Sequence, residues 1–124
     1  MSRRVSRIAW LAKPEAHNYP AALSYLSLVY DARAAARLVR QLREAPVSSF
    51  KSKDIFRASR LSLLGISNLH VEKDRRKIRK GKPISPLLLV RGRDSGRLVI
   101  ADGYHRLCAV YSIDEDALIP CKIV

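Results

Sequence analysis

The chain has 124 residues, of which 48% are hydrophobic and 28% charged, with five glycines and six prolines. This composition is typical of one soluble globular domain and excludes a mostly disordered chain. The longest apolar runs are far shorter than the roughly 20 residues that a membrane span needs, and no apolar stretch after a charged head marks a secretory leader, so we expect a cytoplasmic protein with no membrane partner.

Positive charge dominates the sequence. Lys and Arg number 24 against 11 Asp and Glu, which gives a formal net charge of +13. A field of this sign attracts polyanions, so nucleic acid, nucleotides and an acidic protein are all candidate partners. The oligomeric state does not follow from these observations.

The first half of the chain is expected to be a basic arm followed by helices. Residues 1–18 show no sustained periodicity, and we expect an arm that docks in part through the segment IAWLA at 8–12. From Pro20 the apolar residues step by three and four, and Asp31 can cap a second helix that ends before Pro46. Two short helices and one long bent helix fit this pattern equally well.

A short strand at 47–50 follows these helices. Ser52 is then expected to cap a helix over 53–59, and a loop through Gly65 comes next. We expect a single domain of 1–124 in three parts: a basic arm at 1–18, a helical extension at 19–67 and a core at 68–124.

Turn residues and apolar runs divide the core into helices and strands. Gly81 can close a basic helix, and the nearly unbroken apolar run before Gly92 is typical of a strand buried on both faces. Cys108 and Cys121 have no CxxC spacing and are expected to be buried core thiols. The expected elements are a helix at 70–81, strands at 84–92 and 97–102, a helix at 103–113 and a strand at 118–124.

The stretch ADGYHR at 101–106 places polar side chains where a strand runs into a helix. The first backbone N–H groups of a helix have no partner inside it and bind anions readily. Gly103 lets a ligand come close, and His105 and Arg106 can add donors and charge to a phosphate. The alternative is structural: Asp102 caps the helix, His105 packs locally and Arg106 pairs with a nearby carboxylate.

The segments GKPISPLLLV and DGYHRLCA resemble the shared core of the ParB N-terminal domain and sulfiredoxin, which we trace over residues 68–124. The resemblance implies an α/β (α+β) fold with a small mixed sheet, extended here by the N-terminal helices. It also implies that the turn binds a nucleotide, ATP or CTP, with Mg²⁺. The phosphate-binding residues carried over are Gly103, Tyr104, His105 and Arg106.

The resemblance also limits the expected chemistry. Sulfiredoxins carry a nucleophilic cysteine at the position of Tyr104, and a phenol with a pKa of about 10 cannot replace a thiolate, so we expect no sulfinic-acid reductase activity. ParB proteins read DNA through a helix-turn-helix domain that follows this core, whereas the sequence ends at Val124. We therefore do not expect a full partition protein.

Two alternatives remain open. In the first, the protein is a non-enzymatic nucleic-acid-binding accessory protein that uses the basic helix at 71–80, with Val71 and Ile78 as its buried edge. In the second, it is a metal-dependent phosphotransferase or nuclease in which Asp102 serves as the catalytic carboxylate. The sequence contains no recognisable set of catalytic residues and no metal-binding motif, so it does not decide whether the protein is an enzyme. The residues expected to contact nucleic acid are Arg75, Arg76, Lys77, Arg79, Lys80 and Lys82.

Overall fold

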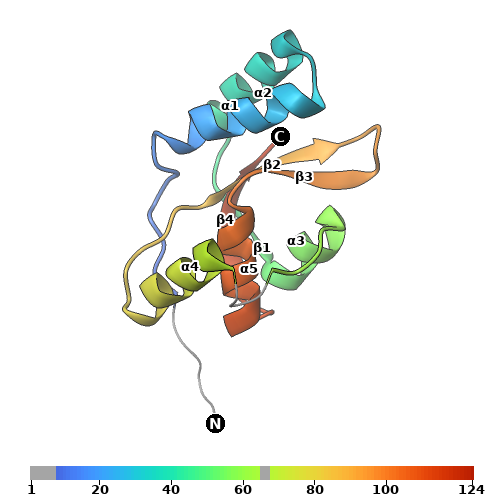
Figure 1. Cartoon of the computed structure of the whole chain (residues 1–124). Helices are drawn as coiled ribbons and strands as arrows, with labels where there is room; N and C mark the ends of the chain where they lie inside the picture. Colours follow the sequence, from blue (N-terminus) through green and yellow to red (C-terminus); the bar gives the residue numbers. More distant parts are fainter. Residues whose placement is uncertain (1–7, 65–67) are drawn as a thin grey trace.

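The computed structural model describes residues 8–64 and 68–124 (Figure 1). Helices and strands are both present, in the α/β fold that the sequence predicts. None of the described helices is long and apolar enough to cross a membrane. The elements in chain order are α1 (Asn18–Val29), α2 (Ala32–Glu44), β1 (Ser48–Lys51), α3 (Ser52–Ser59), α4 (Leu69–Arg79), β2 (Leu87–Gly92), β3 (Arg97–Asp102), α5 (Tyr104–Ile113) and β4 (Leu118–Ile123).

The strands form one mixed sheet in the order β1-β4-β2-β3. β1 pairs with β4, and β2 with β3, in the antiparallel sense, whereas β2 and β4 run parallel. β4 follows β1 and β2 in sequence but lies between them, so that Cys121 faces Ser48 on one side and Leu87 on the other. The small mixed sheet agrees with the expectation from the sequence.

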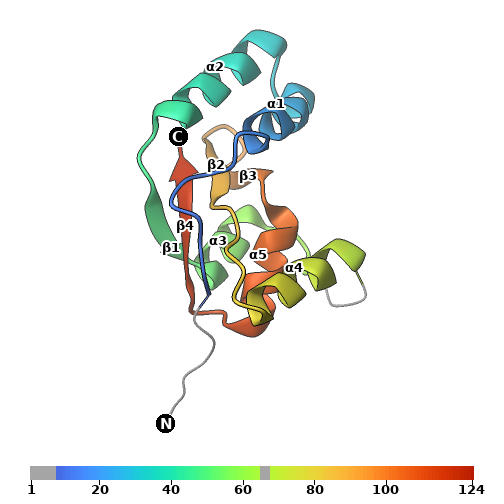
Figure 2. The same cartoon turned by 90° about the vertical axis from the view of Figure 1, so that its left-hand side faces the viewer.

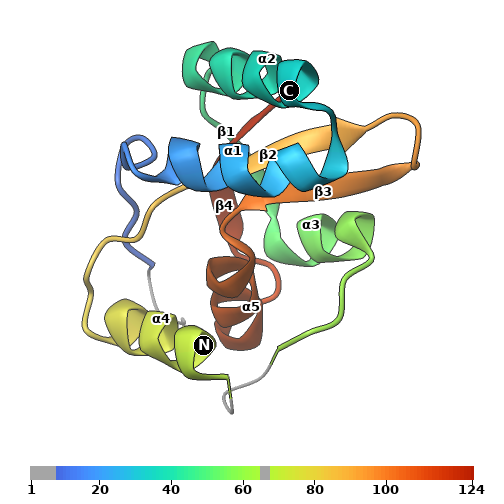
Figure 3. The same cartoon turned by 45° about the horizontal axis from the view of Figure 1, so that its top comes forward.

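β2 is buried on both faces, as its apolar run predicts. Because side chains of a strand alternate between the faces of a sheet, Leu88 and Val90 pack with α1 and α2 on one side. Leu87 and Leu89 pack with α3, α4 and α5 on the other side. Figure 3 shows α1 lying across β2 and β3. The sheet is therefore the middle layer between two layers of helices.

Part of the N-terminal arm docks on the fold, as expected for residues 8–12. Trp10 forms an isolated parallel bridge with Ile84, and the backbone N–H of Leu11 donates to the Ile84 carbonyl at 2.9 Å. Figure 2 shows the segment before α1 running beside the segment that leads into β2. The rest of the expected arm, residues 1–7, lies outside the described residues.

The helix boundaries confirm two local signals. The carboxylate of Asp31 accepts a hydrogen bond from the N–H of Ala34 at 2.8 Å and caps α2. Gly81 follows α4 with a φ of 74°, the left-handed conformation that closes helices. Tyr30 is extended and separates α1 from α2, so the segment contains two helices rather than one bent helix. The expected loop residue Gly65 lies outside the described residues.

The cap expected at Ser52 is wrong. α3 begins at Ser52 itself, after Lys51, and among the described residues no side chain caps its first turn. The buried Ser52 hydroxyl instead shares its proton between the carbonyls of Asp114 at 3.1 Å and Glu115 at 2.7 Å. Ser52 thereby ties α3 to the segment before β4. This partner is distant in sequence, so a local capping rule could not find it.

Candidate functional site

The turn between β3 and α5 lies where the sequence predicts it. β3 ends at Asp102, and Gly103 takes φ 110° and ψ 16°, which turns the chain into α5. A bulge precedes the turn, since Leu88 faces Asp102 whereas Leu89 faces Ile100. Such a bulge bends the strand and changes the direction of the side chains that follow it. Among the described residues no side chain caps this start of α5, which leaves its first N–H groups available to an anion.

Gly103 is required by packing as well as by its backbone conformation. A Cβ at this position would lie 2.8 Å from Cγ of Leu87 and 2.9 Å from Nη2 of Arg106. The space beside the glycine is therefore filled by the protein's own side chains. The close approach of a ligand to Gly103 stays a prediction, and it now competes with this structural reason for the glycine.

Arg106 forms an ion pair with Asp102. Its Nη2 lies 3.1 Å from Oδ2 of Asp102 and donates to the Pro86 carbonyl at 3.3 Å. Both side chains are largely buried, with 16% and 18% of their surface exposed. Arg106 thus has the carboxylate partner of the structural alternative, but Asp102 does not cap α5, whose cap position is Gly103. The buried Nε of Arg106 has no hydrogen-bond partner among the described residues.

A histidine pair joins α4 to the start of α5. The ring centroids of His70 and His105 lie 4.9 Å apart. Burial lowers the pKa of His105 below its ordinary 6.5, and His70 lowers it further against the opposing effect of Asp74, so the imidazole is mostly neutral at pH 7. Burial raises the pKa of Asp74, although Arg106 and Lys77 oppose that shift. The turn therefore lies among groups of both signs.

The two cysteines belong to the packed interior, and the partly buried Tyr104 packs against it. The Tyr104 hydroxyl donates to the Ser62 carbonyl, and burial raises the pKa of this phenol. Cys108 lies one turn further along α5, is fully buried, and has its pKa raised by that burial. Cys121 is also fully buried, and burial raises its pKa to about 11. Both thiols are core residues, as predicted, and neither is placed to act as a nucleophile.

α4 divides its basic side chains into two sets. Glu72 pairs with Arg79 at 3.1 Å and with Arg75 at 3.5 Å, and Arg75 also donates to the Ser112 hydroxyl. These two arginines therefore share one carboxylate, which balances one of their two positive charges. The buried edge of α4 is the predicted one, Val71 and Ile78. The second set lines a shallow depression of about 360 Å³ that no acidic residue lines: Lys73, Arg76, Lys77, Lys80 and Lys82.

The carboxylate considered for catalysis already has a partner. Asp102 is held by Arg106, which neutralises its charge. Over residues 8–64 and 68–124, no group of three or more His, Cys, Asp and Glu side chains could hold a metal ion. Asp102 thus holds Arg106 beneath the turn, and its catalytic role stays a prediction.

Comparison with known proteins adds no assignment. No protein-family model, no curated protein and no solved structure matches the chain. The resemblance to the ParB and sulfiredoxin core therefore rests on the segments GKPISPLLLV and DGYHRLCA alone.

A group of arginines around the β2–β3 hairpin was not predicted from the sequence. Arg91, Arg93 and Arg97 lie in the segment RGRDSGR, which predicted only a strand, a turn and a strand. The fold brings them around one cavity with Arg37 and Arg60. The three hairpin arginines lie within seven residues, and this spacing could have predicted a basic group. Arg37 and Arg60 join that group only through tertiary structure.

The crowding at Gly103 generates a testable difference between two glycines. Gly103 and Gly81 both have a positive φ, but a Cβ at Gly81 would meet nothing within 4 Å. We expect Gly81→Ala to lower the free energy of unfolding by about 1 to 2 kcal/mol through backbone strain alone. Gly103→Ala should cost about 1 to 3 kcal/mol more, because Leu87 and Arg106 must move. Urea unfolding measures both, and equal losses would contradict the packing role.

Burial of the thiols predicts slow chemical labelling. A thiol reagent should modify Cys108 and Cys121 in the folded protein at least about a hundredfold more slowly than in the urea-unfolded chain. This ratio corresponds to a local opening free energy of about 2.8 kcal/mol. Mass spectrometry of quenched time points assigns the label to each cysteine. Rapid labelling of Cys108 under native conditions would show that α5 opens or that its thiol is reactive.

Proposed function

We propose that the protein binds nucleic acid through the exposed basic face of α4 and of the turn that follows it, made of Lys73, Arg76, Lys77, Lys80 and Lys82. The observation that carries this proposal is the division of charge on α4: Glu72 pairs with both Arg75 and Arg79, whereas no acidic residue of the described part of the chain lines the depression between the other five basic residues. A helix surface that serves only solubility has no need of such separation.

The residue types on this face favour contact with the phosphate backbone. Lysine and arginine side chains neutralise phosphates, and such contacts position a protein without reading sequence. The face carries neither Asn nor Gln, the side chains that read adenine. We therefore expect binding to depend weakly on sequence and steeply on salt.

Free buried thiols suit a reducing compartment, and we place the protein in the cytoplasm.

A second candidate function is the binding of a phosphate ligand at the turn before α5, as the resemblance to ParB and sulfiredoxin suggests. The observation in its favour is the uncapped start of α5 beside His105. Arg106 would have to leave, or share, its contact with Asp102 in order to reach the ligand. A nucleotide such as ATP or CTP, with Mg²⁺, is the expected ligand.

Reversal of charge on α4 tests the first proposal. The variant Arg76→Glu/Lys77→Glu/Lys80→Glu should weaken binding to a labelled DNA duplex and flatten the dependence of log K on log salt by up to about 2.7, at 0.9 for each lost phosphate contact. Fluorescence anisotropy over a salt series measures both quantities.

The matched control for α4 makes the same change of charge elsewhere. The triple variant Arg33→Glu/Arg40→Glu/Arg57→Glu alters exposed arginines of α2 and α3 and should keep most of the slope. Equal losses of affinity and slope in the two variants would show that the α4 face acts only through the overall charge of the protein. Absence of binding to duplex and single strands at low salt would contradict nucleic-acid binding altogether.

Calorimetry with ATP, CTP and inorganic triphosphate, with and without Mg²⁺, tests the second candidate. His105→Ala removes a donor at the turn without touching the Asp102–Arg106 pair, and we expect it to weaken binding by about tenfold. Arg106→Ala should weaken binding by at least about tenfold, since a charge-assisted hydrogen bond contributes roughly 1.5 to 3 kcal/mol. Its thermal unfolding must be followed too, because it leaves Asp102 without a partner. Affinities equal to wild type in both variants would refute a phosphate site at the turn.

A further inference from the structure

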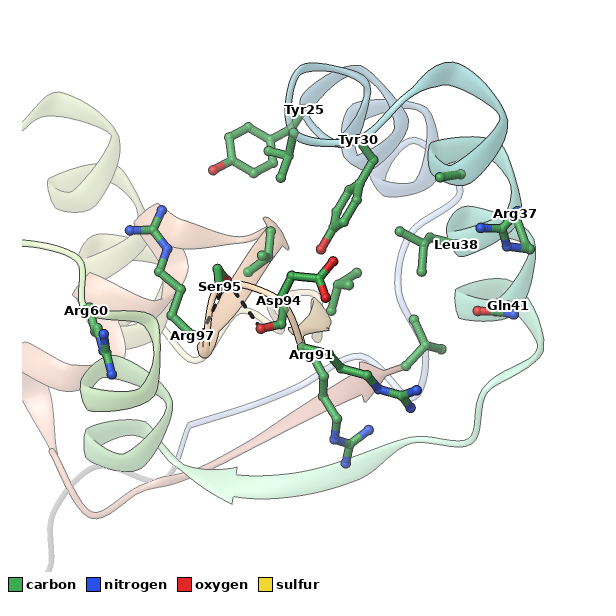
Figure 4. A pocket seen from close by; sticks show the side chains of 17 residues that line it. Tyr25, Tyr30, Arg37, Leu38, Gln41, Arg60, Arg91, Asp94, Ser95 and Arg97 are labelled. Carbon is green, nitrogen blue, oxygen red and sulfur yellow. Dashed lines mark hydrogen bonds between the residues drawn. The ribbon is translucent and has the colours of Figure 1, made fainter.

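A cavity of about 990 Å³ lies between the α1–α2 layer and the β2–β3 hairpin, away from both sites described above (Figure 4). Its size is at the upper end of ordinary ligand-binding pockets. Its lining is strongly basic, since it contains five arginines and the single acidic residue Asp94. The arginines are Arg37 of α2, Arg60 at the end of α3, and Arg91, Arg93 and Arg97 of the hairpin.

Within the described part of the chain, these arginines have no acidic partner. All five are exposed, and none of the ion pairs among the described residues involves them. Figure 4 shows Arg60 and Arg97 on one side of the cavity and Arg37 on the other, so their charges surround the opening instead of converging on one point. This arrangement fits several successive phosphates better than one phosphate group.

Arg60 adds an observation from the backbone. Among the described residues it is the one non-glycine with a positive φ, at φ 59° and ψ 26°. Glycine or asparagine is the usual residue at such a helix end, because a Cβ is strained there. The Arg60 side chain lines the cavity. A binding role there would explain why an arginine occupies this strained position.

Most of the remaining lining residues are apolar or aromatic, and Gln41 and Ser95 are polar. Val90 and Val99 of the sheet and Leu38 of α2 supply an apolar surface. Tyr25 and Tyr30 project from the α1 side toward the hairpin in Figure 4, and Tyr25 is 41% exposed. Aromatic rings next to arginines are the combination on which unpaired bases stack while their phosphates are neutralised. A duplex keeps its base faces inside its own stack and cannot use these rings.

We propose that this cavity binds an unpaired segment of nucleic acid, with its phosphates on the arginine rim and a base against Tyr25 or Tyr30. The inference rests on the proposed nucleic-acid binding and assigns it a second contact, specific for single strands. The carboxylates of an acidic peptide would pair with the arginines, but they offer no ring to stack on the tyrosines and nothing to cover the apolar surface. A free nucleotide carries its charge at one end and would leave the opposite arginines unused.

Fluorescence anisotropy with a labelled single strand of about 12 nucleotides, as DNA and as RNA, and with a DNA duplex tests the proposal. The cavity variant is Arg37→Ala/Arg91→Ala/Arg97→Ala, and the control Arg33→Ala/Arg40→Ala/Arg57→Ala removes the same charge from exposed positions outside the cavity. We expect the cavity variant to bind the single strand about ten- to a hundredfold more weakly than the control, while both bind duplex alike. Thermal unfolding verifies that the variants fold.

A second pair of variants tests the stacking. Tyr25→Ala should weaken single-strand binding by about fivefold or more, whereas Tyr25→Phe should retain it, because stacking needs the ring and not the hydroxyl. Equal single-strand affinity of the cavity and control variants would overturn the proposal. So would displacement of the strand by equimolar ATP or CTP, which indicates a free-nucleotide site, or cavity-dependent binding of polyglutamate as tight as that of the strand, which indicates an acidic protein.

The α4 charge-reversal variant separates this inference from the proposed function. If α4 reversal abolishes duplex binding while the cavity variant still lowers single-strand affinity relative to its control, both proposals stand. If α4 reversal has no effect beyond its own control but the cavity variant does, the α4 face is refuted and the cavity is retained. If only the α4 reversal lowers affinity relative to its control, the cavity proposal fails and the proposed function survives.

Discussion

Burial of β2 on both faces is the constraint on which the rest of the architecture depends. Four consecutive residues, Leu87 to Val90, are apolar and almost fully inaccessible, so no single layer of helices could cover them. α1 and α2 cover one face, and α3, α4 and α5 cover the other. The N-terminal helical pair is therefore a required half of the core, and not an appendage. The turn and α4 belong to one layer, whereas the arginine-lined cavity lies against α1, α2 and the β2–β3 hairpin and takes only Arg60, at the end of α3, from the first layer.

The use of the few acidic side chains decides which positive charges remain available. Asp102 holds Arg106 beneath the turn, and Glu72 holds two arginines of α4. With 11 acids against 24 bases, such pairing leaves most bases without a carboxylate. Among the described residues, ten of the unpaired ones lie on the outer face of α4 and around the hairpin cavity, and others, such as Arg33 and Arg40, lie elsewhere. This placement, more than the net charge, supports a polyanionic partner.

Local signals allowed much of the fold to be predicted. The apolar run at 87–90, the caps at Asp31 and Gly81 and the buried cysteines are consequences of short-range rules, and the structure bears them out. The rest depends on contacts between distant segments. Pairing of β1 with β4, the hydrogen bonds of Ser52 and the meeting of five arginines each join residues that no periodicity connects. At the turn, the sequence named the residues but could not show that Arg106 and Asp102 pair with each other.

The inner position of β4 has a consequence for synthesis of the protein. β4 is made after the other strands, yet it lies between β1 and β2. Until residues 118–123 have emerged from the ribosome, β1 has no neighbour in the sheet and β2 presents an apolar edge with unpaired N–H and C=O groups. Such an edge is a template for pairing with another chain. Insertion of one late strand thus completes the fold and at the same time removes its main risk of aggregation.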